Sequence, residues 1–219
     1  NRYRDRKRMA AIKTVGVIGS GQMGNGIAHV AALAGFDVVL NDLSADRLKS
    51  AMATINGNLS RQVAKKTITE DAHKHALAKI KSSDSLDGLA ACDLVIETAV
   101  EKEEIKRKIF HDVCAVLRPE AIVASNTSSI SITRLAASTD RPEKFIGIHF
   151  MNPVPVMELV ELIRGIATDD ATFDAAREFV TRLGKQVAVS EDFPAFIVNR
   201  ILLPMINEAI YTLYEGVGS

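Results

Sequence analysis

His149 and Glu161 are the two side chains whose chemistry and surroundings point most directly to catalysis. His149 ends an apolar stretch that begins at Lys144, and Pro153 and Pro155 stiffen the loop that follows. Histidine exchanges a proton near neutral pH, so it suits a general base that removes a hydroxyl proton. Glu161 lies twelve residues further on among apolar neighbours, where a carboxylate is costly to bury without a cationic or donor partner. An imidazole is such a partner, so we expect Glu161 to pair with His149.

The chain has four other histidines: His29, His73, His75 and His111. All four fall on predicted helices, and we interpret them as surface or half-buried residues. His149 differs because it ends a predicted strand, and open α/β sheets bind ligands at the carboxyl ends of their strands.

A glycine-rich turn lies between Lys13 and Asp42, within the segment KTVGVIGSGQMGNGIAHVAALAGFDVVLND. An apolar strand leads into the glycines at positions 19, 21 and 24, and an amphipathic helix and a second strand follow. Gly19 permits a tight turn, Gly21 lets the backbone approach a pyrophosphate, and Gly24 lets the helix pack closely on the sheet. Free backbone N–H groups and the positive end of the helix dipole favour phosphates there. The arrangement predicts a nicotinamide-dinucleotide site.

Asp42 indicates which dinucleotide is bound. It follows the last glycine by 42 − 24 = 18 residues, near the spacing of about 20 for a carboxylate that binds the adenosine ribose. A carboxylate there would repel a 2′-phosphate, so we predict NAD and not NADP. The alternative is an ordinary turn between strand and helix with a surface Asp.

Strand and helix patterns alternate along the chain, which is typical of an α/β fold. We expect later strands at 92–97, 121–125, 144–149, 156–163 and 185–190, and helices at 44–66, 69–80, 101–117 and 169–183. The two helices at 44–66 and 69–80 form an insertion in the sheet pattern. The pattern of residues 195–214 predicts a long, mostly apolar helix that Pro204 should kink. A helix this apolar needs a partner surface. We predict a Rossmann-type domain at 12–190 and the start of an all-α domain at 191–219.

Composition excludes several classes of protein. The 219 residues are 47% hydrophobic and 25% charged with a formal net charge of zero, which is typical of a soluble globular protein without a field that attracts nucleic acid or membranes. Cys92 and Cys114 fit neither a zinc site nor a redox pair, so we expect no metal, reduced thiols and a cytoplasmic protein. Residues 1–8 carry five positive charges and one negative charge, and we interpret 1–11 as a disordered leader or extension.

Four motifs in order, GSGQMG, SNTSSI, HFMNPVPVMELVE and FPAFIVNR, resemble the L-3-hydroxyacyl-CoA dehydrogenase family, most closely its bacterial 3-hydroxybutyryl-CoA branch. The resemblance covers nearly all of residues 12–219. It implies reversible, NAD-dependent oxidation of an L-3-hydroxyacyl-CoA to a 3-oxoacyl-CoA in fatty-acid or butyrate-type metabolism.

The resemblance also implies roles for single residues. His149 is similar to the family's general base and Glu161 to the acid that orients it. Ser128 and Asn199 match residues that hydrogen-bond the reacting oxygen. The implied cofactor-binding residues are Gly19, Gly21, Gln22, Met23, Gly24, Asp42, Glu101, Lys106, Asn126 and Asn152. Lys65 and Lys66 fit a basic cluster for the acyl-CoA, although exposed charges without that role remain the alternative.

Two features depart from the family pattern. Ala195 stands where the family usually has Gly, so the backbone there must avoid positive φ or bear strain. Family members continue through further helices that complete the second domain and form a homodimer, so we expect a fragment or an unobserved remainder. Two alternatives stay open: a sugar-acid dehydrogenase of the L-gulonate type or its lens-crystallin relatives, and a truncated, non-catalytic NAD-binding module.

Overall fold

Eight strands form one sheet in the order β3-β2-β1-β4-β5-β6-β7-β8. The computed structural model describes residues 11–218, so the predicted leader lies outside the described residues except at Ala11. The strands are β1 (Thr14–Ile18), β2 (Asp37–Asn41), β3 (Ile80–Ser83), β4 (Leu94–Glu97), β5 (Ile122–Ser125), β6 (Phe145–Phe150), β7 (Leu159–Arg164) and β8 (Gln186–Glu191).

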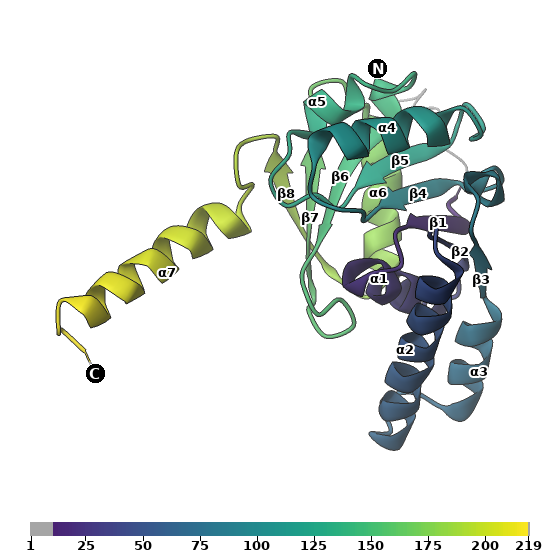
Figure 1. Ribbon diagram of the computed structural model, residues 1–219, viewed down its shortest axis with the longest axis horizontal. Helices are drawn as coiled ribbons and strands as arrows, with labels where there is room; N and C mark the ends of the chain where they lie inside the picture. The colour runs from purple at the N-terminus through teal and green to yellow at the C-terminus, as the bar shows by residue number, and fades with distance from the viewer. Residues whose placement is uncertain (1–10, 219) are drawn as a thin grey trace, which may run out of the picture.

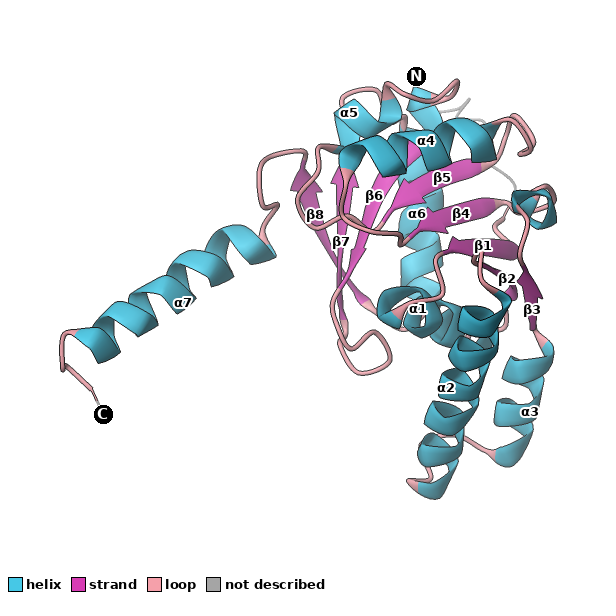
Figure 2. Ribbon diagram, in the orientation of Figure 1, coloured by secondary structure: helices cyan, strands magenta, loops and turns pink. Residues whose placement is uncertain are grey.

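Helices cover both faces of this sheet (Figure 2). The helices of the described residues are α1 (Gln22–Leu33), α2 (Ala45–Ala64), α3 (Glu70–Ala78), α4 (Glu103–Cys114), α5 (Ile132–Ala136), α6 (Asp170–Arg182) and α7 (Val198–Tyr214), with short 3-10 turns η1 (Leu86–Leu89) and η2 (Pro142–Lys144), and of these α7 does not pack on the sheet. The predicted α/β, Rossmann-type fold is confirmed.

The sheet is parallel from β3 through β6, so the carboxyl ends of these strands share one edge. Strand β7 then runs antiparallel to β6, and β8 runs parallel to β7. The antiparallel pairing places the residues of β7 directly opposite those of β6, which brings Glu161 level with His149.

Strand β3 is absent from the predicted elements, because the helix at 69–80 was expected to extend to its first residue. Helix α3 instead ends at Ala78, and Ile80–Ser83 pairs with β2 at the edge of the sheet. Only Ile80 of this strand is buried. A polar edge strand with one buried side chain lacks the apolar pattern that identifies a strand in a sequence.

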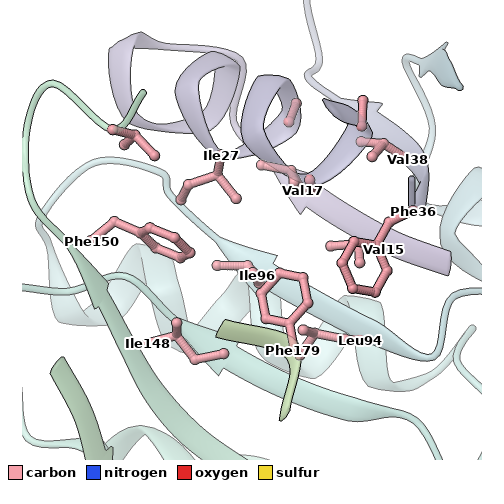
Figure 3. Packing of buried hydrophobic residues seen from close by; sticks show 14 of the residues in the cluster. Val15, Val17, Ile27, Phe36, Val38, Leu94, Ile96, Ile148, Phe150 and Phe179 are labelled. Atoms are coloured by element: carbon pink, nitrogen blue, oxygen red, sulfur yellow. The ribbon is translucent and has the colours of Figure 1, made fainter. Parts of the chain in front are cut away.

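Two apolar clusters lie on opposite faces of the sheet. The larger one packs α1, α2, α3 and α6 against it, and Figure 3 shows Ile27 of α1 with Phe36 and Phe179 among the strand residues. The rings of Phe36 and Phe179 meet edge to face with centroids 5.1 Å apart. The smaller cluster packs α4, α5 and η1 against the other face. Both layers hold the strand ends in fixed positions.

The predicted helical insertion is the α2–α3 pair, which extends away from the sheet (Figure 1). Each helix begins where its sequence predicts. The hydroxyl of Ser44 accepts a hydrogen bond from the N–H of Arg47, and that of Thr69 accepts one from the N–H of Ala72. Such side-chain caps satisfy the unpaired N–H groups of a first helical turn.

Helix α7 projects away from the sheet (Figure 1). It contains Pro204 without ending there. The segment before it has positive φ at Ala195 (69°) and Phe196 (51°). Ala195 therefore adopts the left-handed backbone conformation that non-glycine residues disfavour. Of the two outcomes expected at this position, the structure shows strain and not avoidance of positive φ. Within the described residues, no helix is long and apolar enough to cross a membrane.

Candidate active site

The glycine turn leaves room where a dinucleotide would lie. Gly19 has φ 93°, and a Cβ on Gly24 would lie 1.7 Å from the carbonyl oxygen of Gly19. A Cβ on Gly21 would meet nothing within 4 Å. Helix α1 begins at Gln22 without a side-chain cap or an acidic residue in its first turn, and Met23 turns toward the core. The open backbone and uncapped helix end fit a pyrophosphate.

Asp42 lies beside this turn, directly after β2. Its carboxylate accepts hydrogen bonds from Ser20 and from the N–H of Ser44. Burial raises the pKa of Asp42, but these hydrogen bonds outweigh burial and hold the pKa below its ordinary value. A carboxylate is thus present and ionised where the sequence predicts one.

His149 and Glu161 form a buried pair across β6 and β7. The Nδ1 atom of His149 lies 2.7 Å from Oε2 of Glu161, and the residues are 7% and 0% exposed. Burial raises the pKa of Glu161, but hydrogen bonds from His149 and two backbone N–H groups lower it below its ordinary value. The contact orients the ring, and Nε2 has no hydrogen-bond partner among the described residues. The chemistry of an oriented base is available here.

Glu161 also anchors the start of α7. Its Oε1 atom accepts hydrogen bonds from the backbone N–H groups of Ile197 (2.9 Å) and Val198 (2.8 Å). The same carboxylate therefore contacts the imidazole with one oxygen and the first turn of α7 with the other. The ring of Phe196, just before this turn, has its centroid 5.8 Å from that of His149.

Asn199 of α7 reaches the loop that follows β5. Its side-chain Nδ2 donates to the carbonyl oxygen of Ser128 over 3.3 Å. The hydroxyl of Ser128 makes no hydrogen bond within the described part of the chain. The structure thus brings Ser128 and Asn199 together, two residues that are 71 positions apart.

Glu101 holds the Ser128 loop in place. Its Oε1 atom accepts from the hydroxyl of Thr127, the N–H of Ser128 (3.0 Å) and the hydroxyl of Ser129 (3.0 Å). Burial raises the pKa of Glu101, but these donors and Lys106 lower it below its ordinary value. The sequence singles out Glu101 for the cofactor and does not reveal this contact with the loop.

Lys106 lies inside the protein at 1% exposure. Its Nζ atom contacts both oxygens of Glu97, at 2.7 and 2.9 Å, and lies 3.4 Å from Glu101. Burial raises the pKa of Glu97, although Lys106 and the hydroxyl of Ser125 donate to it. The pair lies beneath the Glu101 loop, and Lys106 has little surface that a cofactor could contact.

Asn126 connects the ends of three neighbouring strands. Its N–H donates to the carbonyl oxygen of Glu97 at the end of β4, and its Oδ1 accepts from the N–H of Phe150 at the end of β6. It therefore fixes the spacing between the Ser128 loop and His149.

A pocket of about 450 Å³ lies between the glycine turn, α2 and the loop after β6. Asn152 lines it, together with Ser20, Gly21 and Gln22. Lys65 and Lys66 are exposed at the C-terminal end of α2 and do not line it. From α2 the pocket is lined by Arg47, Ser50, Ala51, Thr54 and Asn58.

The polar residues on that face of α2 were not predicted from the sequence. Arg47, Ser50, Thr54 and Asn58 recur at intervals of three and four residues, beside the buried stripe of Leu48, Ala51, Ile55 and Leu59. A polar stripe at helical spacing is the signal that could have identified them. Within residues 11–218, no cluster of His, Cys, Asp and Glu could hold a metal ion.

Comparison with known proteins identifies the family. Residues 14–193 match the family model described as 3-hydroxyacyl-CoA dehydrogenase, NAD binding domain. Over 210 residues, the chain is 83% identical to a 3-hydroxybutyryl-CoA dehydrogenase of Bradyrhizobium diazoefficiens, covering 96% of this chain and 72% of that protein. It is 41% identical to a 3-hydroxyadipyl-CoA dehydrogenase of Escherichia coli, covering 96% of this chain and 44% of that protein.

A solved structure has the same architecture. The crystal structure of (S)-3-hydroxybutyryl-CoA dehydrogenase from Ralstonia eutropha is 49% identical with a TM-score of 0.92, and the match covers 95% of this chain and 74% of that chain. The resemblance expected from the four motifs is confirmed, as is NAD as the cofactor of this domain. The chain therefore belongs to the 3-hydroxyacyl-CoA dehydrogenase family.

Proposed function

We propose that this chain catalyses the reversible, NAD-dependent oxidation of an L-3-hydroxyacyl-CoA to a 3-oxoacyl-CoA. The observation that carries the proposal is the buried pair of His149 and Glu161, at the sheet edge where β1 ends in the glycine turn. Oxidation of a secondary alcohol needs a group that takes the hydroxyl proton. When bound, NAD accepts the hydride.

His149 takes that proton at Nε2, because Nδ1 is held by Glu161. Glu161 keeps the ring in this orientation and stabilises the imidazolium that forms, as a buried carboxylate does for a catalytic histidine in a hydrolase triad. In the reductive direction, the same nitrogen returns the proton to the substrate oxygen.

Ser128 and Asn199 bind the reacting oxygen in this proposal. The hydroxyl of Ser128 has no protein partner in the described chain, and Asn199 already lies within hydrogen-bond distance of the same residue. Donors aimed at an oxygen that gains negative charge stabilise the transition state. The Glu101 carboxylate supports this by fixing the loop that carries Ser128.

The adenosine ribose lies at Asp42 and the pyrophosphate at the glycine turn. The pocket of about 450 Å³ has the glycine turn on one side and α2 on the other, and we place the acyl-CoA on the α2 side, where the polar side chains suit amide and hydroxyl groups of a CoA chain. The names of the relatives favour 3-hydroxybutyryl-CoA as the substrate. Lys65 and Lys66 would act at the outer end of α2, on the phosphates.

We further propose that residues 12–190 form the NAD-binding domain and that 191–219 begin a second, helical domain that forms a homodimer. Exposed apolar side chains of α7 support this proposal, among them Ile201, Leu203, Met205, Ile210 and Leu213. A cytoplasmic location is also part of the proposal, supported by the free thiols of Cys92 and Cys114.

The test is the oxidation of NADH by the purified chain in the presence of acetoacetyl-CoA. The reaction is measured as the decrease in NADH absorbance. Parallel reactions contain free acetoacetate, and NAD with L-gulonate. Turnover that requires the CoA thioester supports the proposal. Equal or faster turnover of L-gulonate, or none with acetoacetyl-CoA while NAD binds, would overturn it.

A further inference from the structure

Ser20 occupies the variable position between the first two glycines of the turn, and it is 4% exposed. Strands β1 and β2 pair in register up to Ile18 and Asn41, and the N–H of Gly19 donates to the carbonyl oxygen of Asn41. The segments that follow β1 and β2 are therefore held close to each other. This register places Ser20 beside Asp42.

Both hydrogen-bond donors of Ser20 are directed at one oxygen. The N–H of Ser20 lies 3.0 Å from Oδ2 of Asp42, and the hydroxyl lies 2.8 Å from the same atom. A hydroxyl has a single proton to donate. Neither donor of Ser20 is therefore available to a phosphate, and the pyrophosphate must be bound by the backbone further along the turn.

The carboxylate of Asp42 has few acceptor positions left. An ionised carboxylate offers about four lone-pair positions on its two oxygens. Ser20 occupies two on Oδ2, and the N–H of Ser44 occupies one on Oδ1 at 3.1 Å. The remaining position is on Oδ1, so the orientation of the carboxylate determines which group of a ribose it can meet.

We propose that Ser20 is a specificity-determining positioning residue, whose hydroxyl fixes the Asp42 carboxylate so that the site selects NAD over NADP. This inference rests on the proposed ribose-binding role of Asp42. A fixed, ionised oxygen accepts a hydrogen bond from a ribose hydroxyl and repels a 2′-phosphate. Without the hydroxyl of Ser20, the carboxylate can rotate away from that phosphate, and its charge is less strongly stabilised.

The test is calorimetric binding of NAD and NADP to the purified chain, its Ser20→Ala variant and a matched control, Ser44→Ala. The control removes a neighbouring hydroxyl that caps α2, but keeps the N–H that contacts Asp42. We expect Ser20→Ala to reduce the ratio of the NADP to the NAD dissociation constants by about tenfold, and Ser44→Ala to preserve it. Ser20→Thr, which retains the hydroxyl, should restore the preference.

The pH dependence of NAD binding separates positioning from a merely structural role. Because Ser20 lowers the pKa of Asp42, loss of NAD binding on acidification should begin at a higher pH in Ser20→Ala. Thermal unfolding of each variant identifies any that fails to fold.

Asp42→Asn distinguishes the two ways in which the idea can fail. If the unmodified chain and Asp42→Asn show the same preference, the ribose role of Asp42 is wrong, and the inference with it. If Asp42→Asn loses the preference while folded Ser20→Ala keeps it, only the role of Ser20 is overturned.

Discussion

The Glu161 carboxylate contacts His149 with Oε2 and the first turn of α7 with Oε1, so one side chain orients the imidazole and anchors the helix that carries Asn199. Because β6 and β7 pair antiparallel, the two residues are direct neighbours across the sheet. The position of the proposed base is thereby linked to the position of a proposed substrate donor.

Glu161→Gln should lower kcat by about 10²-fold or more, because a neutral amide cannot stabilise the imidazolium. The dissociation constant for NAD should stay the same. Glu158→Gln is the control, since Glu158 is exposed and its carboxylate makes no hydrogen bond in the described residues. A kcat close to that of the unmodified chain would contradict the role of Glu161.

Two glycines of the turn should respond differently to the same substitution. Gly24→Ala places a methyl group against the Gly19 carbonyl oxygen, so it should destabilise the fold by about 3 kcal/mol or more. Gly21→Ala has space and should leave the free energy of unfolding within about 0.5 kcal/mol. It should nevertheless weaken NAD binding about tenfold, because the methyl group occupies the pyrophosphate position. Urea unfolding and calorimetry measure the two effects, and equal stability losses would count against this description of the turn.

Asp192 attaches the segment before α7 to the start of α5. Its carboxylate accepts from the hydroxyl of Ser131 (2.7 Å) and the N–H groups of Ile132 (2.9 Å) and Thr133 (2.8 Å). Asp192→Ala should lower the free energy of unfolding by about 1 to 3 kcal/mol in urea titrations. Asp84→Ala, which removes an exposed carboxylate, should change it little.

The contribution of Asp192 should disappear in acid. Burial raises its pKa, but the donors outweigh burial and hold the pKa below the ordinary value of 3.8. The stabilisation is therefore complete well above pH 3.8, and it is lost progressively as the pH falls through 3.8 and then through the lower pKa of the folded state. The stability difference between the unmodified chain and Asp192→Ala should narrow over that range. A difference that persists unchanged would show that the carboxylate charge is not involved.

The pocket assignment can be tested on α2. Thr54→Phe should raise the KM for acetoacetyl-CoA about tenfold by filling the pocket, with little change in NAD affinity. Ala53→Phe adds the same ring to an exposed neighbour that does not line the pocket. Equal KM values for the two variants would place the acyl-CoA elsewhere.

Features set by local chemistry were predictable from the sequence. The glycine turn, the caps at Ser44 and Thr69, and most strands follow from residues that are adjacent in the chain. Strand β3 was missed because its stability comes from pairing with β2, and only Ile80 carries an apolar signal. The direction of β7 depends on the loop before it and on its pairing with β6. The apolar residues of a strand do not indicate in which direction the strand runs.

The candidate site was also predictable only where residue chemistry alone indicates a contact. The pairing of His149 with Glu161 follows from a buried carboxylate that needs a partner. The contacts of Glu101 with the Ser128 loop and of Ser20 with Asp42 join segments that follow different strands, so only the folded chain reveals them. The roles carried over from the family for these residues stay predictions.

The most direct test of the proposed mechanism is the turnover of His149→Gln with acetoacetyl-CoA and NADH, alongside its affinity for NAD. Glutamine retains polarity but cannot act as a base or acid near neutral pH. If His149 transfers the proton, kcat should fall by about 10²- to 10⁴-fold while the dissociation constant for NAD stays unchanged. Turnover close to that of the unmodified chain would contradict the mechanism.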